Sequence, residues 1–328
     1  MPDFKRIYGV DFSSSPSKRK PIVVSQAGWV TDKQHSVFEL QAFHRFSDIA
    51  SFEVFLAQQP EWMGGFDMPF GLSRHLLDVL QWPGARRYDL QAWDAFVDFY
   101  AALDRAELRT VFQAWCNAHP PGQKFAHRAC DRPAQSSPSM KWINPPVAYM
   151  LHAGAPLLKR LDAHIPQQRA GNAKRVALEA YPGFLAKQCL GRRSYKNDDA
   201  SKQSDARQQA RQHIIEVLLQ DTHGFEVSLA SGLKQGMLED PKGDVLDAAL
   251  CAFQVAQALQ ADPQNYMRPD DVDPLEGWIL TVPHAQVPRH LPALAEVEAA
   301  LLRASVLKAL PQALQLKLVH LQNPQVDA

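Results

Sequence analysis

The sequence predicts an α/β protein that opens with an antiparallel meander and continues as single strands alternating with helices. Short runs of apolar and β-branched residues at 4–11, 21–30 and 35–44 are separated only by turn residues, which is typical of neighbouring antiparallel strands. Beyond them, short apolar runs alternate with segments whose apolar residues recur every three to four positions, which predicts helices between strands. Several of the short runs end in an acidic residue, and these ends are candidates for function.

One helix and a further strand follow the meander directly. Asp48 can cap an amphipathic segment that ends near Pro60, so we expect a helix there. Residues 62–66 then form a brief apolar run that closes on Asp67. The first strand closes in the same way on Asp11, so the pattern of a strand followed by a carboxylate repeats.

A helical insertion is expected at about 85–165, inside a domain that spans 1–283. Residues 89–118 carry apolar side chains close to a spacing of three to four, which indicates one or two helices. The stretch 119–146 is rich in Pro, Ser and basic residues and is the longest irregular segment, a kind of loop that is usually functional. A further helix is expected at 147–161.

The rest of the domain again alternates strands with helices, and residues 284–328 follow it as an Ala- and Leu-rich appendage. We expect this appendage to be a helical hairpin broken by Pro311 that packs on the body of the protein or on a protein partner. The remaining expected elements are a strand at 176–180, a helix opened by Pro182, a helix from Ser201, a strand at 225–229, a helix at 244–259 and an edge strand at 277–283.

Composition excludes several classes of protein. Lys and Arg number 35, as do Asp and Glu, so a nucleic-acid partner would need a local basic patch. A hydrophobic content of 46% with 21% charged residues is ordinary for a soluble globular protein. No apolar run is long enough for a membrane span and the first residues lack a signal-peptide core, so we expect a cytoplasmic protein without membrane contact. The cysteines are too sparse for a disulfide framework: Cys116, Cys130, Cys189 and Cys251.

Acidic side chains stand at the boundaries of several predicted elements. Asp11, Asp67 and Glu179 lie at strand ends, and the pair Asp244 and Asp247 lies at a helix start. The pair shares one helix face because the two residues are three apart. Close carboxylates repel each other, and a divalent cation removes that cost. The positive end of the helix dipole favours the ionised form of Asp244, and such oxygen ligands suit Mg²⁺ or Mn²⁺.

Four motifs in a fixed order resemble those of a bacterial and archaeal family known as domain of unknown function 429. They read GVDFSSSP, GFDMPFGL, ALEAYPG and GDVLDAAL, and the resemblance covers about residues 5–283. That family is assigned to the ribonuclease-H-like superfamily and is predicted to contain nucleases. The resemblance therefore implies a ribonuclease-H-like mixed sheet, in which an antiparallel meander of three strands is extended by parallel strands and flanked by helices.

For the active site, the resemblance implies two Mg²⁺ or Mn²⁺ ions held by acidic residues. In the superfamily the ligands are the first-strand aspartate, a second acid at a neighbouring strand end and an aspartate on the last helix. On this chain those are Asp11, then Asp67 or Glu179, then Asp247 with Asp244 beside it. Glu179 is the preferred second ligand, with Asp67 as the competing catalytic carboxylate. The implied reaction is hydrolysis of phosphodiester bonds by a two-metal mechanism.

The expected substrate is a nucleic acid or a nucleotide. Between Arg169 and Arg211 there are ten Lys and Arg against four Asp and Glu, so this segment is locally basic. Tyr195 can stack on a base. Arg192, Arg193 and Lys196 are equally compatible with a solvated loop that binds no phosphate. The expected substrate-binding residues are Ser13, Ser14, Arg128, Arg192, Arg193, Tyr195 and Lys196.

A different metal pattern is Cys116-x-x-His119 followed by His127-x-x-Cys130. Soft and borderline ligands at these spacings permit a tetrahedral zinc site. We do not favour zinc there, because Cys116 lies at a predicted helix end beside Trp115 and is as readily explained as a buried thiol.

Two other functions are compatible with the same pattern. A non-catalytic module that binds nucleic acid or protein would keep the acidic pocket as a relic or for a structural metal. An ATP-dependent phosphotransferase shares a comparable sheet and an acidic strand end before a Ser-rich turn, but it needs two copies of the fold and a second Gly-rich loop. The sequence contains neither.

Overall fold

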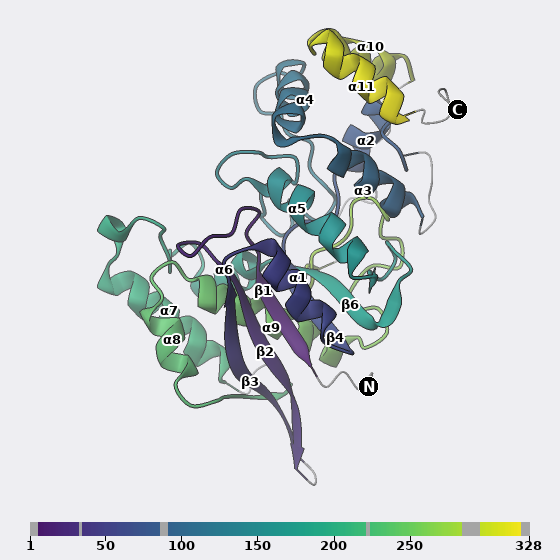
Figure 1. Cartoon of the computed structure of the whole chain (residues 1–328). Helices are drawn as coiled ribbons and strands as arrows, with labels where there is room; N and C mark the ends of the chain where they lie inside the picture. Colours follow the sequence, from purple (N-terminus) through teal and green to yellow (C-terminus); the bar gives the residue numbers. More distant parts are fainter. Residues whose placement is uncertain (1–5, 33–34, 86–90, 221–223, 284–295, 323–328) are drawn as a thin grey trace.

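The computed structural model describes residues 6–32, 35–85, 91–220, 224–283 and 296–322. Across these residues the strands form one mixed sheet in the order β5-β6-β4-β1-β2-β3-β7. Helices cover the sheet, and a group of helices extends away from one end of it (Figure 1). The strands are β1 Ile7–Asp11, β2 Ile22–Asp32, β3 His35–Phe46, β4 Trp62–Asp67, β5 Ala163–His164, β6 Asn172–Ala180 and β7 Glu226–Leu229.

The predicted antiparallel meander is confirmed. Strand β2 pairs antiparallel with both β1 and β3, as the short turns between them require. The other neighbours are parallel: β4 lies beside β1, β6 beside β4, and β7 beside β3. Parallel neighbours need a crossover, and helices supply it, so the chain is an α/β protein with a mixed sheet.

The two faces of the sheet bury separate apolar clusters. Helices α1 and α5 pack on one face, and α6, α7 and α9 pack on the other. This division follows from side chains that alternate between the faces along each strand. The helices are α1 Ile49–Ala57, α2 Arg74–Leu80, α3 Ala92–Ala102, α4 Arg105–Asn117, α5 Val147–Arg160, α6 Pro182–Leu190, α7 Asp205–Leu218, α8 Leu233–Glu239, α9 Asp244–Ala261, α10 Glu296–Lys308 and α11 Gln312–Gln322.

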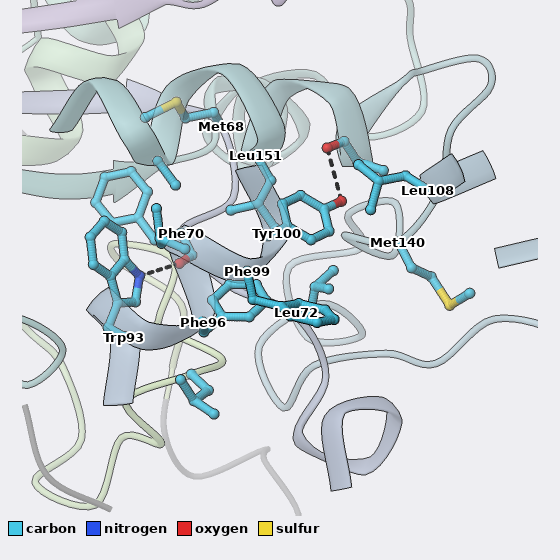
Figure 2. Packing of buried hydrophobic residues seen from close by; sticks show 14 of the residues in the cluster. Met68, Phe70, Leu72, Trp93, Phe96, Phe99, Tyr100, Leu108, Met140 and Leu151 are labelled. Carbon is cyan, nitrogen blue, oxygen red and sulfur yellow. Dashed lines mark hydrogen bonds between the residues drawn. The ribbon is translucent and has the colours of Figure 1, made fainter. Parts of the chain in front are cut away.

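Helices α2 to α5 lie between β4 and β5 in the chain, where the helical insertion is expected. Their aromatic residues pack with the turn that follows β4, as Figure 2 shows. Two buried polar groups are hydrogen-bonded inside this cluster: the indole nitrogen of Trp93 donates to the carbonyl of Phe70 at 2.7 Å, and the hydroxyl of Tyr100 donates to the carbonyl of Ala148 at 3.1 Å. The insertion is therefore continuous with one face of the sheet.

The C-terminal helices α10 and α11 pack against this insertion, at its far end from the sheet (Figure 1). Val306, Leu310, Leu314 and Leu318 bury their side chains there. The break between the two helices lies at Pro311, as predicted, because proline cannot continue the helix. Among the described residues no helix is both long and apolar enough to cross a membrane.

The predicted edge strand at 277–283 is wrong. Only a single parallel bridge forms there, between Ile279 and Glu179. Gly277 and Thr281 have φ values of 73° and 65°, and such left-handed residues on either side end the extended conformation. The helix expected to start near Ser201 is present as α7, which begins at Asp205 after a short 3-10 turn at Ala200–Lys202. Residues 86–90 and 284–295, which contain part of two predicted helical segments, lie outside the described residues.

The backbone of helix α9 packs directly against the backbones of β1 and β4, because the strand residues that face it are glycines. A Cβ atom at Gly9 would lie 2.0 Å from the carbonyl oxygen of Ala248, and one at Gly65 would lie 2.7 Å from that of Cys251. The hydroxyl of Ser25 donates to the same Ala248 carbonyl at 2.7 Å. These contacts place the first turn of α9 at the carboxyl ends of β1 and β4.

Substitution of Gly9 by alanine is expected to destabilise the protein strongly. The added methyl group has no space against the α9 backbone, and overpacking of this kind costs about 1–3 kcal/mol or more. Gly236→Ala is the matched control, because a Cβ there meets nothing within 4 Å and the residue lies inside α8. Urea denaturation of both variants measures the difference, and equal stability of Gly9→Ala and the native protein would contradict the packing described.

Candidate active site at the carboxyl ends of β1, β4 and β6

Asp11 and Asp67 lie side by side on the face of the sheet that α9 covers. Gly9 and Gly65 are paired in register on adjacent parallel strands, and each aspartate follows its glycine by two residues. Since side chains alternate along a strand, both carboxylates project on the same face as the two glycines, towards α9. The structure thus brings these two predicted residues together.

Asp247 and Asp244 reach the same place from the first turn of α9. Asp247 is fully buried and accepts two hydrogen bonds: one from the hydroxyl of Tyr195 at 2.5 Å and one from the ammonium of Lys196. Asp244, three residues earlier in the same turn, is also buried. Both interact electrostatically with Asp11. Four of the five predicted carboxylates therefore form one acidic cluster, which consists of Asp11, Asp67, Asp244 and Asp247.

Burial and mutual repulsion disfavour the charged forms of these carboxyl groups. The pKa of Asp11 is raised well above its usual value, first by burial and then by the charge of Asp247. The pKa of Asp67 is raised to about 7 by burial and again by Asp247. The pKa of Asp244 is raised to about 6 by burial, Asp240 and Asp247. These effects act against the helix dipole, which favours the ionised form of Asp244.

Lys196 is the cation within the cluster. Burial lowers its pKa, but the attraction of Asp247, with smaller contributions from Tyr195 and Asp11, raises the pKa well above its usual value. Lys196 in turn opposes the rise in pKa at Asp11 and Asp67. Its positive charge therefore partly neutralises the carboxylates around it.

Glu179, the preferred second ligand, lies on the other face of the sheet. It pairs in register with Phe66, whereas Asp67 pairs with Ala180, so the side chains of Glu179 and Asp67 alternate to opposite faces. Both of its oxygens accept from Arg128, at 2.7 and 2.8 Å, and one also accepts from the backbone amide of Phe70 at 3.0 Å. Glu179 is thus engaged in a buried ion pair, which does not support the preference for it over Asp67.

Arg128 is buried and fully engaged, so it is not available to bind a substrate phosphate. Besides Glu179, its guanidinium donates to Asp131 at 2.9 Å and to the carbonyl of Glu276 at 2.9 Å. The carboxylate of Glu276 accepts from the backbone amides of Arg74 and Ala129, at 2.7 and 2.8 Å. This network attaches the long irregular segment to the end of β6.

The other predicted substrate-binding residues differ in how exposed they are. Arg192 and Arg193 are exposed on the loop after α6. Tyr195 is buried, so its ring offers no face for stacking on a base. Ser13 is buried, and the carbonyl of Ser14 accepts from Arg105 of α4 at 2.5 Å, so the turn after β1 is held by the insertion.

The zinc pattern does not assemble. The thiol of Cys116 donates to the carbonyl of Lys124 at 3.3 Å, and a ring nitrogen of His119 is 2.7 Å from the carbonyl of Trp115. Across the part of the chain that the structure describes, no three His, Cys, Asp or Glu side chains are arranged closely enough to hold a metal ion together. The acidic cluster, to which Lys196 donates a hydrogen bond, is no exception.

The comparison with known families identifies this chain. A family model described as protein of unknown function (DUF429) matches residues 9–273. The chain belongs to the DUF429 family. The matched region of this DUF429 protein contains all five predicted carboxylates and ends before α10 and α11. Neither a search of curated proteins nor a search of solved structures found a match.

Sequence reasoning missed several residues that shape the site of this DUF429 protein. The side chain of Asp240 accepts from the backbone amide of Val245 at 2.8 Å and so caps α9. Lys20, in the exposed turn between β1 and β2, lies close enough to lower the pKa of Asp244. One signal was present in the sequence: the strands before Asp11 and Asp67 share the pattern Gly-x-Asp, which Glu179 lacks.

Replacing Arg128 by methionine is expected to destabilise the DUF429 protein by about 3–5 kcal/mol, because it leaves Glu179 and Asp131 buried without their cation. Urea denaturation measures the loss. Arg132→Met, at an exposed position of the same segment, is the control and should change stability by less than about 0.5 kcal/mol. A similarly small effect of Arg128→Met would show that the network contributes little.

The Asp67→Asn variant is expected to be more stable than the native protein at pH 8 and similar to it near pH 4. The pKa of Asp67 rises from 3.8 to about 7 on folding, so the folded state binds the proton more tightly. Its contribution to stability is therefore present below pH 3.8 and is lost as the pH rises towards 7.

Denaturation at both pH values, without divalent cations, tests this expectation for Asp67. The gain at pH 8 should be about 1–3 kcal/mol. Asp98→Asn, which removes an exposed carboxylate of α3, should leave the pH dependence unchanged. An Asp67→Asn variant that loses stability at pH 8 would contradict the repulsion inferred for the cluster.

Proposed function

We propose that this DUF429 protein is a divalent-metal-dependent nuclease or phosphoesterase of the ribonuclease-H-like type. The observation that carries the proposal is the placement of Asp11, Asp67 and Asp247 on one face, where the carboxyl ends of parallel strands meet the first turn of α9. The sheet supports it as well: an antiparallel meander is extended by parallel strands, with an aspartate at the end of its first strand.

The donor set fits a hard divalent cation in its chemistry. Asp11, Asp67 and Asp247 offer carboxylate oxygens, which Mg²⁺ and Mn²⁺ prefer. Burial, and after it the charge of Asp247, raises the pKa of Asp11 and of Asp67, and a bound cation would favour the charged form of both carboxyl groups. Bound there, Mg²⁺ or Mn²⁺ would activate a water and stabilise the leaving oxygen of a phosphodiester. The described side chains do not yet converge on one point, so binding requires them to rearrange.

In this proposal the residues of the site have separate roles. Asp11, Asp67 and Asp247 hold the metal, and Asp244 lies at the edge of the cluster. Glu179 positions the turn after Asp67, because its carboxylate accepts from the backbone amide of Phe70 while Arg128 fixes it in place. Tyr195 orients Asp247 through its hydroxyl.

Exposed cations next to the cluster support a phosphate-bearing substrate. Lys18, Arg19 and Lys20 are exposed in the turn between β1 and β2, and Lys20 interacts electrostatically with Asp244. Lys242, just before α9, donates to the carbonyl of Arg19, so this turn lies beside the start of the helix. Such a rim can attract the phosphates of a nucleic acid or nucleotide.

One observation favours a second candidate, a non-catalytic binding module on the same fold. The ammonium of Lys196 already supplies a positive charge to the carboxylates, and no ready-made metal arrangement exists among the described residues. Isothermal titration separates the two candidates, because the absence of Mn²⁺ binding to the native protein would favour the binding module.

Cleavage assays test the proposed reaction. With Mg²⁺ or Mn²⁺ present, the native protein should cleave at least one of structured RNA, single-stranded RNA, duplex DNA and single-stranded DNA. Asp11→Asn should lower the rate by at least about 100-fold, the scale of removing one group that stabilises the transition state. Asp98→Asn is the control and should keep full activity. Activity that survives in Asp11→Asn would refute the assigned site.

The choice between Asp67 and Glu179 is tested by metal binding. Asp67→Asn should lose Mn²⁺ binding in isothermal titration. Glu179→Gln should keep it below the unfolding temperature of that variant, because Glu179 lies on the opposite face and contacts Arg128. The reverse result would restore Glu179 as the second ligand.

A further inference from the structure

The backbone on both sides of Lys196 is held by hydrogen bonds to other parts of the fold. The next-door Tyr195 is buried, and its carbonyl accepts from Arg211 at 2.8 Å. The backbone amide of Asn197 donates to the carbonyl of Pro241 at 3.2 Å. The segment that carries Lys196 is thus attached to α7 on one side and to the residues before α9 on the other.

The aliphatic part of Lys196 lies over Gly243, the residue that precedes α9. A Cβ atom at Gly243 would lie 3.0 Å from both Cβ and Cδ of Lys196, so a side chain there would crowd the lysine. Gly243 also has a φ of 77°, which favours glycine. Because Gly243 has no side chain, the side chain of Lys196 has space to extend past the backbone before α9 and reach Asp247.

The charged end of Lys196 lies where the acidic cluster needs a cation. Its ammonium donates to one carboxylate oxygen of Asp247, and the other oxygen accepts from Tyr195. It also interacts electrostatically with Asp11 and Asp67. The single positive charge of Lys196 thus interacts with carboxylates on two strands and one helix.

The partners in this ion pair differ in their freedom to move. The side chain of Asp247 is 1% exposed, whereas that of Lys196 is 42% exposed. Asp247 is fixed by the helix and by Tyr195, but Lys196 has a flexible four-carbon stem and an open path to solvent. The ammonium can therefore leave the cluster while Asp247 keeps its place on α9.

We infer that Lys196 is a resident counter-ion of the acidic cluster, which a divalent metal ion displaces when it binds. This inference rests on the proposed metal-dependent function. Before the metal arrives, the ammonium limits the repulsion among Asp11, Asp67 and Asp247. A metal ion held by these carboxylates would take the place of the ammonium, and the partly exposed side chain of Lys196 would turn out into solvent. Lys196 is thus a positioning residue that sets the affinity of the site for metal.

Isothermal titration with Mn²⁺ is the first test. Lys196→Met keeps the apolar stem and removes the competing charge, so Mn²⁺ should bind about 10-fold to 100-fold more tightly than to the native protein. Lys196→Gln serves as a second variant if the first folds poorly. Lys174→Met is the matched control, because it removes an exposed lysine at the opposite end of β6 from the cluster and should change the affinity by less than about 3-fold.

Displacement itself is tested on the native protein by brief acetylation with acetic anhydride, followed by peptide mass spectrometry. An ammonium that leaves its ion pair with buried Asp247 is more accessible to the reagent, so saturating Mn²⁺ should raise the acetylation rate of Lys196 by at least about 3-fold. The rate at Lys174, at the far end of β6 from the cluster, should change less. A rate at Lys196 that stays constant or falls would overturn the displacement.

The outcomes separate this inference from the proposed function. Equal Mn²⁺ affinity of the native protein and Lys196→Met, with binding lost in Asp11→Asn, would overturn the role of Lys196 and leave the metal site standing. Failure of the native protein and both Lys196 variants to bind Mn²⁺ would overturn both proposals. Weaker binding to Lys196→Met would also overturn displacement, since the lysine would then support the metal.

Discussion

The close contact of helix α9 with the backbones of β1 and β4 determines the geometry of the candidate site. Gly9 and Gly65 have no side chains to hold the helix away, and Ser25 ties a helix carbonyl to the sheet. The first turn of α9 therefore reaches the carboxyl ends of the two strands. Without this approach, Asp247 would not lie against Asp11 and Asp67.

Gathering these carboxylates costs stability, and the fold offsets part of that cost locally. Lys196 and Tyr195 donate to Asp247, and the capping side chain of Asp240 completes the start of α9. Burial, and after it the charge of Asp247, still raises the pKa of Asp67 to about 7. Functional sites typically contain residues whose arrangement lowers the stability of the fold but favours the binding of a ligand.

A second set of charges has a structural role on the opposite face. Glu179, Asp131 and Arg128 form a buried ion network with satisfied hydrogen bonds, and it joins the irregular segment at 119–146 to the end of β6. Buried networks of this kind cost much when one partner is removed. Acidic residues that look equivalent in the sequence thus serve different purposes on the two faces of one sheet.

The sequence by itself determined the local features: the antiparallel meander, the strand endings at Asp11 and Asp67, and the helix that begins at Asp244. These depend on short-range patterns of apolar residues, turns and caps. Only the tertiary structure decided which acidic residues meet. The register between β4 and β6 turns Glu179 away from Asp67, and the fold after α6 brings Lys196 into the cluster from a loop. Register and long-range packing depend on contacts between residues far apart in the chain, which no local pattern encodes.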